Sequence, residues 1–98
     1  MVYMMKRNVK RMEINLPAIA VGDLIRAYDF EPIPGRPDMY FVGIVKDIGW
    51  IRNEYIGYTI DVVYDSLTQD MPKASRVGRT GYVPVQTSMD WDGRVTRI

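Results

Sequence analysis

The sequence predicts one small all-β domain in which five short strands curl into a barrel. A chain of 98 residues with 47% hydrophobic and 26% charged residues can fold, but it is long enough for only one core. Alternation of apolar and polar residues with a period of two recurs along the chain, as half-buried strands require. Glycine, proline and Asp-Gly turn signals separate these segments. Closure into a barrel would remove the unpaired edges of such a sheet.

The strands follow from runs of β-branched and aromatic residues bounded by turn residues. Gly43 lies inside one run and indicates a bulge, whereas Pro84 restricts its own strand to an edge or a bulge. Two connections are long, and the first of them contains three prolines and a glycine. We expect strands at residues 24–30, 39–48, 54–65, 81–87 and 94–98, loops at 31–38, 49–53 and 66–79, and no internal helix.

The third strand has the cleanest alternation in the chain. Its apolar positions predict a buried face, and its acidic positions predict a face toward solvent. We therefore expect Asp61 and Asp65 to be solvated acids on the polar face, near Asp47 if the second and third strands pair. The predicted core face is Tyr58, Ile60, Val62 and Tyr64, and the opposite face is Thr59, Asp61, Val63 and Asp65.

An N-terminal arm, residues 1–20, precedes the predicted β-barrel domain, residues 21–98. Val2, Met5, Val9 and Met12 recur at spacings of three and four, which favours one face of a short helix. So short a helix is unstable alone, so the arm packs on its own barrel, pairs with a second subunit or frays. Lys6, Arg7, Lys10 and Arg11 give residues 1–11 a charge of +4, which leaves −3 on residues 12–98.

Composition excludes several classes of function. The chain has no cysteine and no histidine, so it lacks disulfides, thiolate ligands and the commonest general base and metal ligand. We therefore predict no enzyme, no metal and no small-molecule cofactor. No apolar run reaches the length needed to span a bilayer, and no signal peptide is recognisable. A soluble cytoplasmic protein without membrane contact is the expectation.

Two segments resemble the conserved ends of Src-homology-3 domains. The segment Arg26-Ala27-Tyr28-Asp29-Phe30-Glu31-Pro32 is similar to the family's alanine-leucine-tyrosine-aspartate-aromatic motif, and Gly81-Tyr82-Val83-Pro84 to its late glycine-aromatic-aliphatic-proline motif. The leucine of the first motif is absent, and Thr87 stands where the family has a second tyrosine. The resemblance implies a five-stranded SH3-like barrel with an N-terminal arm or short helix. An oligonucleotide-binding barrel is the second choice of fold.

The resemblance also implies a protein-binding groove for polyproline-type peptides. Trp50 lies between the two motifs, as the family's binding tryptophan does. The predicted protein-binding residues are Tyr28, Phe30, Trp50, Tyr82 and Pro84. The chain is also similar in overall look to small barrel proteins of tailed phages, which would place it in the host cytoplasm or the virion.

Other charged groups have ordinary explanations. Asp90 and Asp92 lie two residues apart beside Gly93, but Arg94 and Arg97 follow where a calcium loop needs oxygen ligands, so a solvated turn is expected. The loop before Gly81 carries Lys73, Arg76 and Arg79 without the glycine-lysine core of a phosphate loop.

The leading hypothesis is a non-catalytic protein-interaction or assembly module that associates with itself or with another chain. Eleven aromatic residues and a methionine-rich arm suit an adaptable contact surface. The alternative is a nucleic-acid-binding barrel that uses basic residues of the arm and of the loop at residues 73–79. Its predicted binding residues are Lys6, Arg7, Lys10, Arg11, Lys73, Arg76 and Arg79.

Overall fold

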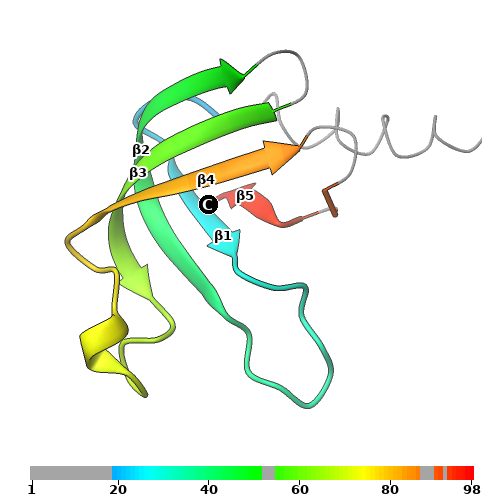
Figure 1. Cartoon of the computed structure of the whole chain (residues 1–98), viewed down its shortest axis with the longest axis vertical. Coiled ribbons are helices and arrows are strands. Elements are labelled where there is room, and N and C mark those ends of the chain that lie inside the picture. Colours follow the sequence, from blue (N-terminus) through cyan, green and yellow to red (C-terminus); the bar gives the residue numbers. More distant parts are fainter. Residues whose placement is uncertain (1–18, 52–54, 87–89, 92) are drawn as a thin grey trace, which may run out of the picture.

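The computed structural model describes residues 19–51, 55–86, 90–91 and 93–98, which form one antiparallel sheet of five strands (Figure 1). This arrangement confirms the all-β class. One 3₁₀ turn, η1, spans Pro72–Ala74 in the long connection before the fourth strand. The strands are β1 (Leu24–Tyr28), β2 (Tyr40–Ile51), β3 (Tyr55–Asp65), β4 (Thr80–Gln86) and β5 (Val95–Arg97).

The strand order is β4-β3-β2-β1-β5. The first four strands form a meander, and β5 returns to pair with the free side of β1. In the described residues β4 and β5 are the edges of the sheet and do not pair, so the sheet is not closed. It is nevertheless strongly bent (Figure 1), and a cavity of about 220 Å³ is lined both by Tyr28 in β1 and by Tyr82 in β4.

The core occupies the inner face of the bend, where alternate residues of each strand meet. Strand β1 contributes Ile25 and Ala27 to the core, and β4 contributes Val83 and Val85. Each of these four residues is 2% exposed or less. Ile19 and Ile48 pack against this group from its border. The buried core cluster is Ile25, Ala27, Phe41, Val45, Ile56, Tyr58, Ile60, Val62, Val83, Val85 and Val95.

Gly43 lies at a bulge between β2 and β3, as its sequence position predicts. Val42 pairs with Tyr64 and Gly43 pairs with Val62, so Val63 has no partner and the alternation restarts beyond it. The predicted faces of β3 are therefore wrong at its end, because Tyr64 is exposed while Asp65 is buried.

Pro84 lies on an edge strand, which confirms its predicted position. The Arg94 guanidinium donates to the Pro84 carbonyl at 3.0 Å from outside β4. In a strand the N and C=O of one residue point to the same side, so the missing N–H of Pro84 faces away from β3 and removes no ladder bond.

The loop predicted at 49–53 is shorter than expected, because β2 continues to Ile51. Trp50 therefore lies within the strand, paired with Ile56, rather than in a loop. The other strand bounds lie within two residues of the predicted ones, and the start of β1 and the end of β3 match them. Residues 1–18, which contain most of the predicted arm, lie outside the described residues.

Candidate functional site

Four aromatic side chains form a row across the sheet, on the face opposite the core. Tyr28 on β1 lies 5.5 Å from Tyr40 on β2, and Tyr40 lies 5.6 Å from Tyr64 on β3, measured between ring centres. Trp91, in the segment before β5, lies 5.7 Å from Tyr28. We call Trp91, Tyr28, Tyr40 and Tyr64 the aromatic row. Its tilted rings lie at the distances that aromatic pairs prefer.

Register places this row on the outer face. Tyr28 pairs with Tyr40, and the flanking residues of β1, Ala27 and Ile25, point into the core instead. Tyr64 is 48% exposed, and the other three side chains of the row are half-buried. A hydrogen bond with Tyr40 raises the pKa of the Tyr64 hydroxyl, so the Tyr64 phenol is neutral near pH 7.

Arg26 adjoins the row. It lies two residues before Tyr28 on β1, and its guanidinium carbon is 5.1 Å from the centre of the Tyr28 ring. Register places Val42 on one side of Arg26 and Thr96 on the other. Its Nε is enclosed and has no hydrogen-bond partner. Stacking on an aromatic ring is a common use of arginine, and it leaves the N–H donors at the edge of the guanidinium plane available.

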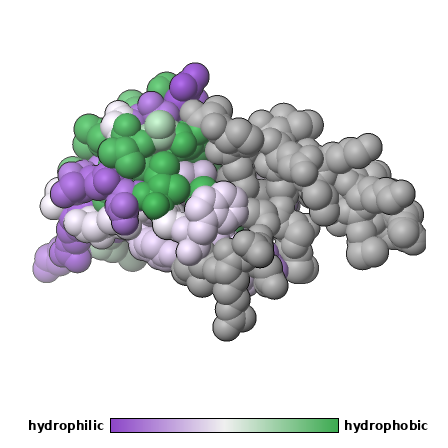
Figure 2. All heavy atoms as spheres, turned by 90° about the horizontal axis from the view of Figure 1, so that it is seen from above, coloured by the Kyte–Doolittle hydropathy of each residue, from purple (hydrophilic) through white to green (hydrophobic). Residues whose placement is uncertain are grey.

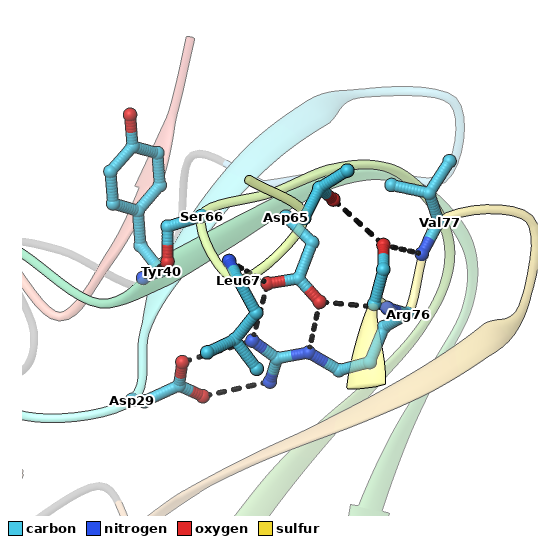
Figure 3. Close-up of polar contacts among 9 residues, drawn as sticks. Asp29, Tyr40, Asp65, Ser66, Leu67, Arg76 and Val77 are labelled. Atoms are coloured by element: carbon cyan, nitrogen blue, oxygen red, sulfur yellow. Dashed lines mark hydrogen bonds and ion pairs between the residues drawn. The ribbon is translucent and has the colours of Figure 1, made fainter. Parts of the chain in front are cut away.

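A second polar group closes one end of the core (Figure 3). Asp65, 1% exposed at the end of β3, accepts the Arg76 Nε at 2.7 Å and its Nη2 at 2.9 Å. The backbone N–H groups of Arg76 and Leu67 also donate to Asp65, at 2.8 and 3.0 Å. The same guanidinium donates to both oxygens of Asp29, at 2.8 and 3.0 Å, and lies 4.1 Å above the Phe41 ring.

This ion cluster of Asp65, Arg76 and Asp29 fastens the loop at 66–79 to β3 and to the end of β1. Hydrogen bonds from Arg76 hold the pKa of Asp65 far below its usual range, although burial opposes this effect. Bonds to Asp65 and then to Asp29 raise the pKa of Arg76. Because four guanidinium N–H bonds already go to these carboxylates, the cluster is a structural fastening with little bonding capacity left for a ligand.

The five predicted protein-binding residues come from β1, β2, β4 and the loop at 29–39. Tyr28 belongs to the aromatic row, and Phe30, 68% exposed, follows it in the loop at 29–39. Trp50, 61% exposed, lies near the other end of the long strand β2. Tyr82 and Pro84 are exposed on β4. The Tyr82 ring lies over Gly57 of the neighbouring strand β3, because a Cβ added at Gly57 would collide with that ring. Of the five, Tyr28 and Tyr82 line the same cavity of about 220 Å³, whereas Phe30, Trp50 and Pro84 do not line it.

Three of the predicted nucleic-acid-binding residues lie in the described part of the chain, all in the connection between β3 and β4. Lys6, Arg7, Lys10 and Arg11 lie outside the described residues. Lys73, in η1, and Arg79, just before β4, are both exposed to solvent. The guanidinium of Arg76 is held between Asp65 and Asp29, as described above, and is not presented with the other two cations.

Acidic residues form no metal site in the described part of the chain, where no group of three or more His, Cys, Asp or Glu side chains could hold a metal ion. Asp61 pairs with Lys46 at 3.7 Å, and Asp90 pairs with Arg94 at 2.7 Å. Asp92 lies outside the described residues. No helix in the described ranges is long and apolar enough to cross a membrane.

Hydrophobic side chains reach the surface away from the aromatic row as well. Phe30 and Ile33 border a hollow of about 400 Å³ within the loop at 29–39. Val21, Ile44 and Val63 are also exposed. On the face drawn in Figure 2, hydrophobic residues form a continuous group beside hydrophilic ones.

No protein-family model, curated protein or solved structure matches this chain. The function must therefore be argued from its own residues.

Sequence reasoning found one member of the row, Tyr28, and did not select Tyr40, Tyr64, Trp91 or Arg26. The period of two already places Arg26 and Tyr28 on one face of β1. Tyr64 was assigned to the core because the bulge at Val63 leaves no mark in the local pattern. Trp91 joins the row through tertiary structure alone.

Proposed function

We propose that this protein is a non-catalytic protein-interaction module that binds its partner through the aromatic row. One observation carries the proposal: a sheet that already has a complete inner core also aligns four large aromatic side chains on its outer face. Tyrosine and tryptophan supply much of the binding energy of protein interfaces, because they bury a large area and lose little side-chain entropy. A second copy of the chain is a further candidate partner for this surface.

The face of the sheet supports this role better than its edge does. An exposed edge strand binds an added strand through free backbone N–H and C=O groups. On β4 the outward position of Pro84 has no N–H, and its carbonyl already accepts a bond from Arg94. The Gln86 carbonyl accepts the N–H of Asp90. These groups protect the second half of β4 from strand addition.

We further propose that the curled sheet is a barrel of the Src-homology-3 type. The four-strand meander, with the last strand returning beside the first, supports this assignment. Arg94 spans the gap between the two edges, because it lies directly before β5 and its side chain bonds β4. The cavity lined by Tyr28 and Tyr82 also requires that β1 and β4 face each other across the bend.

The proposal is tested by selecting a random peptide library against the full chain and measuring the affinity of enriched peptides by fluorescence anisotropy. Replacing Tyr64 by Ser should weaken binding about tenfold, because removal of an interface tyrosine costs more than about 1 kcal/mol. Trp50→Ser is the control, since Trp50 is 61% exposed on the same sheet but lies near the other end of β2, away from the row. Equal effects of the two substitutions, or no enriched peptide, would refute the proposal.

Self-association is measured on the same proteins by sedimentation velocity over a wide range of concentration. We expect a concentration-dependent dimer that Tyr64→Ser dissociates and Trp50→Ser preserves. A monomer at every concentration would remove self-association from the proposal and leave another chain as the partner.

A further inference from the structure

We propose that Arg26 is the position at which the aromatic row receives a carboxylate, so that the partner is an acidic segment of another protein. This inference rests on the proposed function, because it names the chemistry of the partner that the same face would bind. It depends on an observation separate from the row itself, which is an arginine with no counter-charge among the described residues.

The Arg26 guanidinium has N–H donors that the surrounding described residues leave without an acceptor. Three acids of the described residues are paired with other cations: Asp61 with Lys46, Asp90 with Arg94, and Asp23 with Arg97. Among the described residues, no hydrogen bond or ion pair reaches the Arg26 side chain. Its contact with the Tyr28 ring fixes the guanidinium but satisfies none of its N–H donors. A charged group held in this way gains more from an incoming acceptor than one already bonded within the protein.

A carboxylate suits this position by geometry. The planar guanidinium presents pairs of parallel N–H groups that match the two oxygens of Asp or Glu. Because the Nε is enclosed, we assign the two terminal Nη groups to the ligand. Stacking on Tyr28 holds the guanidinium in place before binding, so less side-chain freedom is lost when the ligand arrives.

A phosphate group is the less suitable ligand, because its recognition in proteins uses clusters of cations. The positions that flank Arg26 on this face are Val42, Thr96 and Tyr28, and none of them is cationic. A single arginine set among apolar and aromatic groups instead matches the single charge of a carboxylate.

The register also sets the spacing of the ligand's residues. Arg26, Val42 and Tyr64 lie in one line across β1, β2 and β3. Two strand spacings separate Arg26 from Tyr64, which is roughly 10 Å, the length of about three residues of an extended peptide. We therefore expect an acidic residue on Arg26 and an apolar residue about three positions away on Tyr64.

The experiment uses the peptides enriched on the full chain and tests both sides of the contact. Enriched sequences should contain Asp or Glu about three residues from an apolar residue. Arg26→Gln should weaken the best of them about tenfold, and changing the peptide's acid to its amide should have the same effect on the unmodified protein. Combining the two changes should add little further loss, because each removes the same contact.

Controls separate this contact from a general effect of charge or folding. Arg26→Lys keeps the charge but lacks the planar pair of donors, so it should recover only part of the affinity. Arg79→Gln removes an exposed cation before β4 and should leave the affinity unchanged. The ¹H–¹⁵N spectrum of Arg26→Gln should match that of the original protein outside the neighbourhood of residue 26.

The failures are distinguishable. Enriched peptides that depend on Tyr64 but lack acidic residues, or that bind Arg26→Gln equally well, would overturn the carboxylate site and leave the proposed function standing. Peptides that depend on neither Tyr64 nor Arg26, or a library with no enriched peptide, would overturn both. Stronger Arg26-dependent binding of a phosphotyrosine peptide than of its glutamate analogue would replace the carboxylate by a phosphate.

Discussion

At Asp65 a carboxylate lies within the end of the core, where an unpaired charge would be strongly unfavourable. Four N–H groups make it tolerable, two from the Arg76 side chain and two from the backbone of Leu67 and Arg76. Asp29 holds the remaining side of the guanidinium, so the charges of the ion cluster are partly balanced within it. One residue thereby orders both the end of β3 and the loop that follows it.

Replacement of Asp65 by Asn should lower the free energy of unfolding by about 2–3 kcal/mol at pH 7, the scale of charged hydrogen bonds lost from a buried site. The pKa of Asp65 is lower in the folded protein than its ordinary value of 3.8, so the folded state binds this proton less tightly. Its contribution is complete above that ordinary value and is lost as the pH falls toward the folded value.

Urea unfolding at a series of pH values checks this prediction. The stability difference between the original protein and Asp65→Asn should be largest at neutral pH and should shrink below about pH 5. Asp61→Asn is the control, because that carboxylate is exposed and its pair with Lys46 is long. We expect it to change stability by about 0.5 kcal/mol or less. A difference for Asp65→Asn that does not vary with pH would contradict the assigned charge.

The sequence alone predicted the opposite environment for Asp65. Strict alternation through β3 places every second residue on one face, and it holds from Tyr58 to Val62. Beyond that point one unpaired residue, Val63, exchanges the two faces. Whether a bulge forms on β3 depends on the strand beside it, so the pattern within β3 contains no signal for it.

At the scale of elements, the same bulge explains Gly43. A Cβ at this position would lie 2.6 Å from the Asp61 carbonyl oxygen and 2.7 Å from Ile60 Cδ1. The two strands approach so closely here that only glycine fits without movement of the backbone. Gly43 could be recognised from the sequence as a break in β2, whereas the partner strand responsible for the contact could not.

We expect Gly43→Ala to destabilise the protein by about 2–3 kcal/mol, because β2 and β3 must separate to admit the methyl group. Gly49→Ala is the matched control on the same pair of strands, where a Cβ would have no neighbour within 4 Å. Alanine there should be neutral or stabilising by about 0.5 kcal/mol, since it restricts the unfolded chain. Thermal unfolding of both variants measures the difference, and equal losses would contradict the close approach at Gly43.

At the scale of the whole molecule, the five strands and the edge position of Pro84 were predictable because local alternation and turn residues determine them. The proposed binding surface could not be predicted in this way. Tyr28, Tyr40, Tyr64 and Trp91 come from four separate segments, and only the register of β1, β2 and β3 and the return of the chain before β5 bring them together. Tyr28 pairs with Tyr40 at the start of β2, whereas Trp50 lies near the end of the same strand, and this separation is likewise a result of tertiary structure.

The curvature of the molecule brings two unpaired edges near each other, and Arg94 is the side chain that connects them. Its Nη1 donates to the Pro84 carbonyl at 3.0 Å and to Asp90 at 2.7 Å, in a site where both side chains are largely buried. The strand that it adjoins, β5, is three residues long, and within the part of the chain that the structure describes it pairs with β1 alone. The position of β5 therefore depends strongly on the Arg94 link, whereas each inner strand is held by a neighbour on both sides.

Replacement of Arg94 by Gln should lower the free energy of unfolding by about 1.5–2 kcal/mol, because a charged hydrogen bond and an ion pair are lost together. Amide hydrogen exchange locates the effect. Exchange of Val95 and Arg97 should accelerate far more than exchange of Tyr58 and Ile60, since β5 can separate while the meander stays intact. Lys46→Gln, which breaks an exposed pair, should leave both rates unchanged. Uniform acceleration across β3 and β5 would show that Arg94 stabilises the whole sheet rather than its open edge.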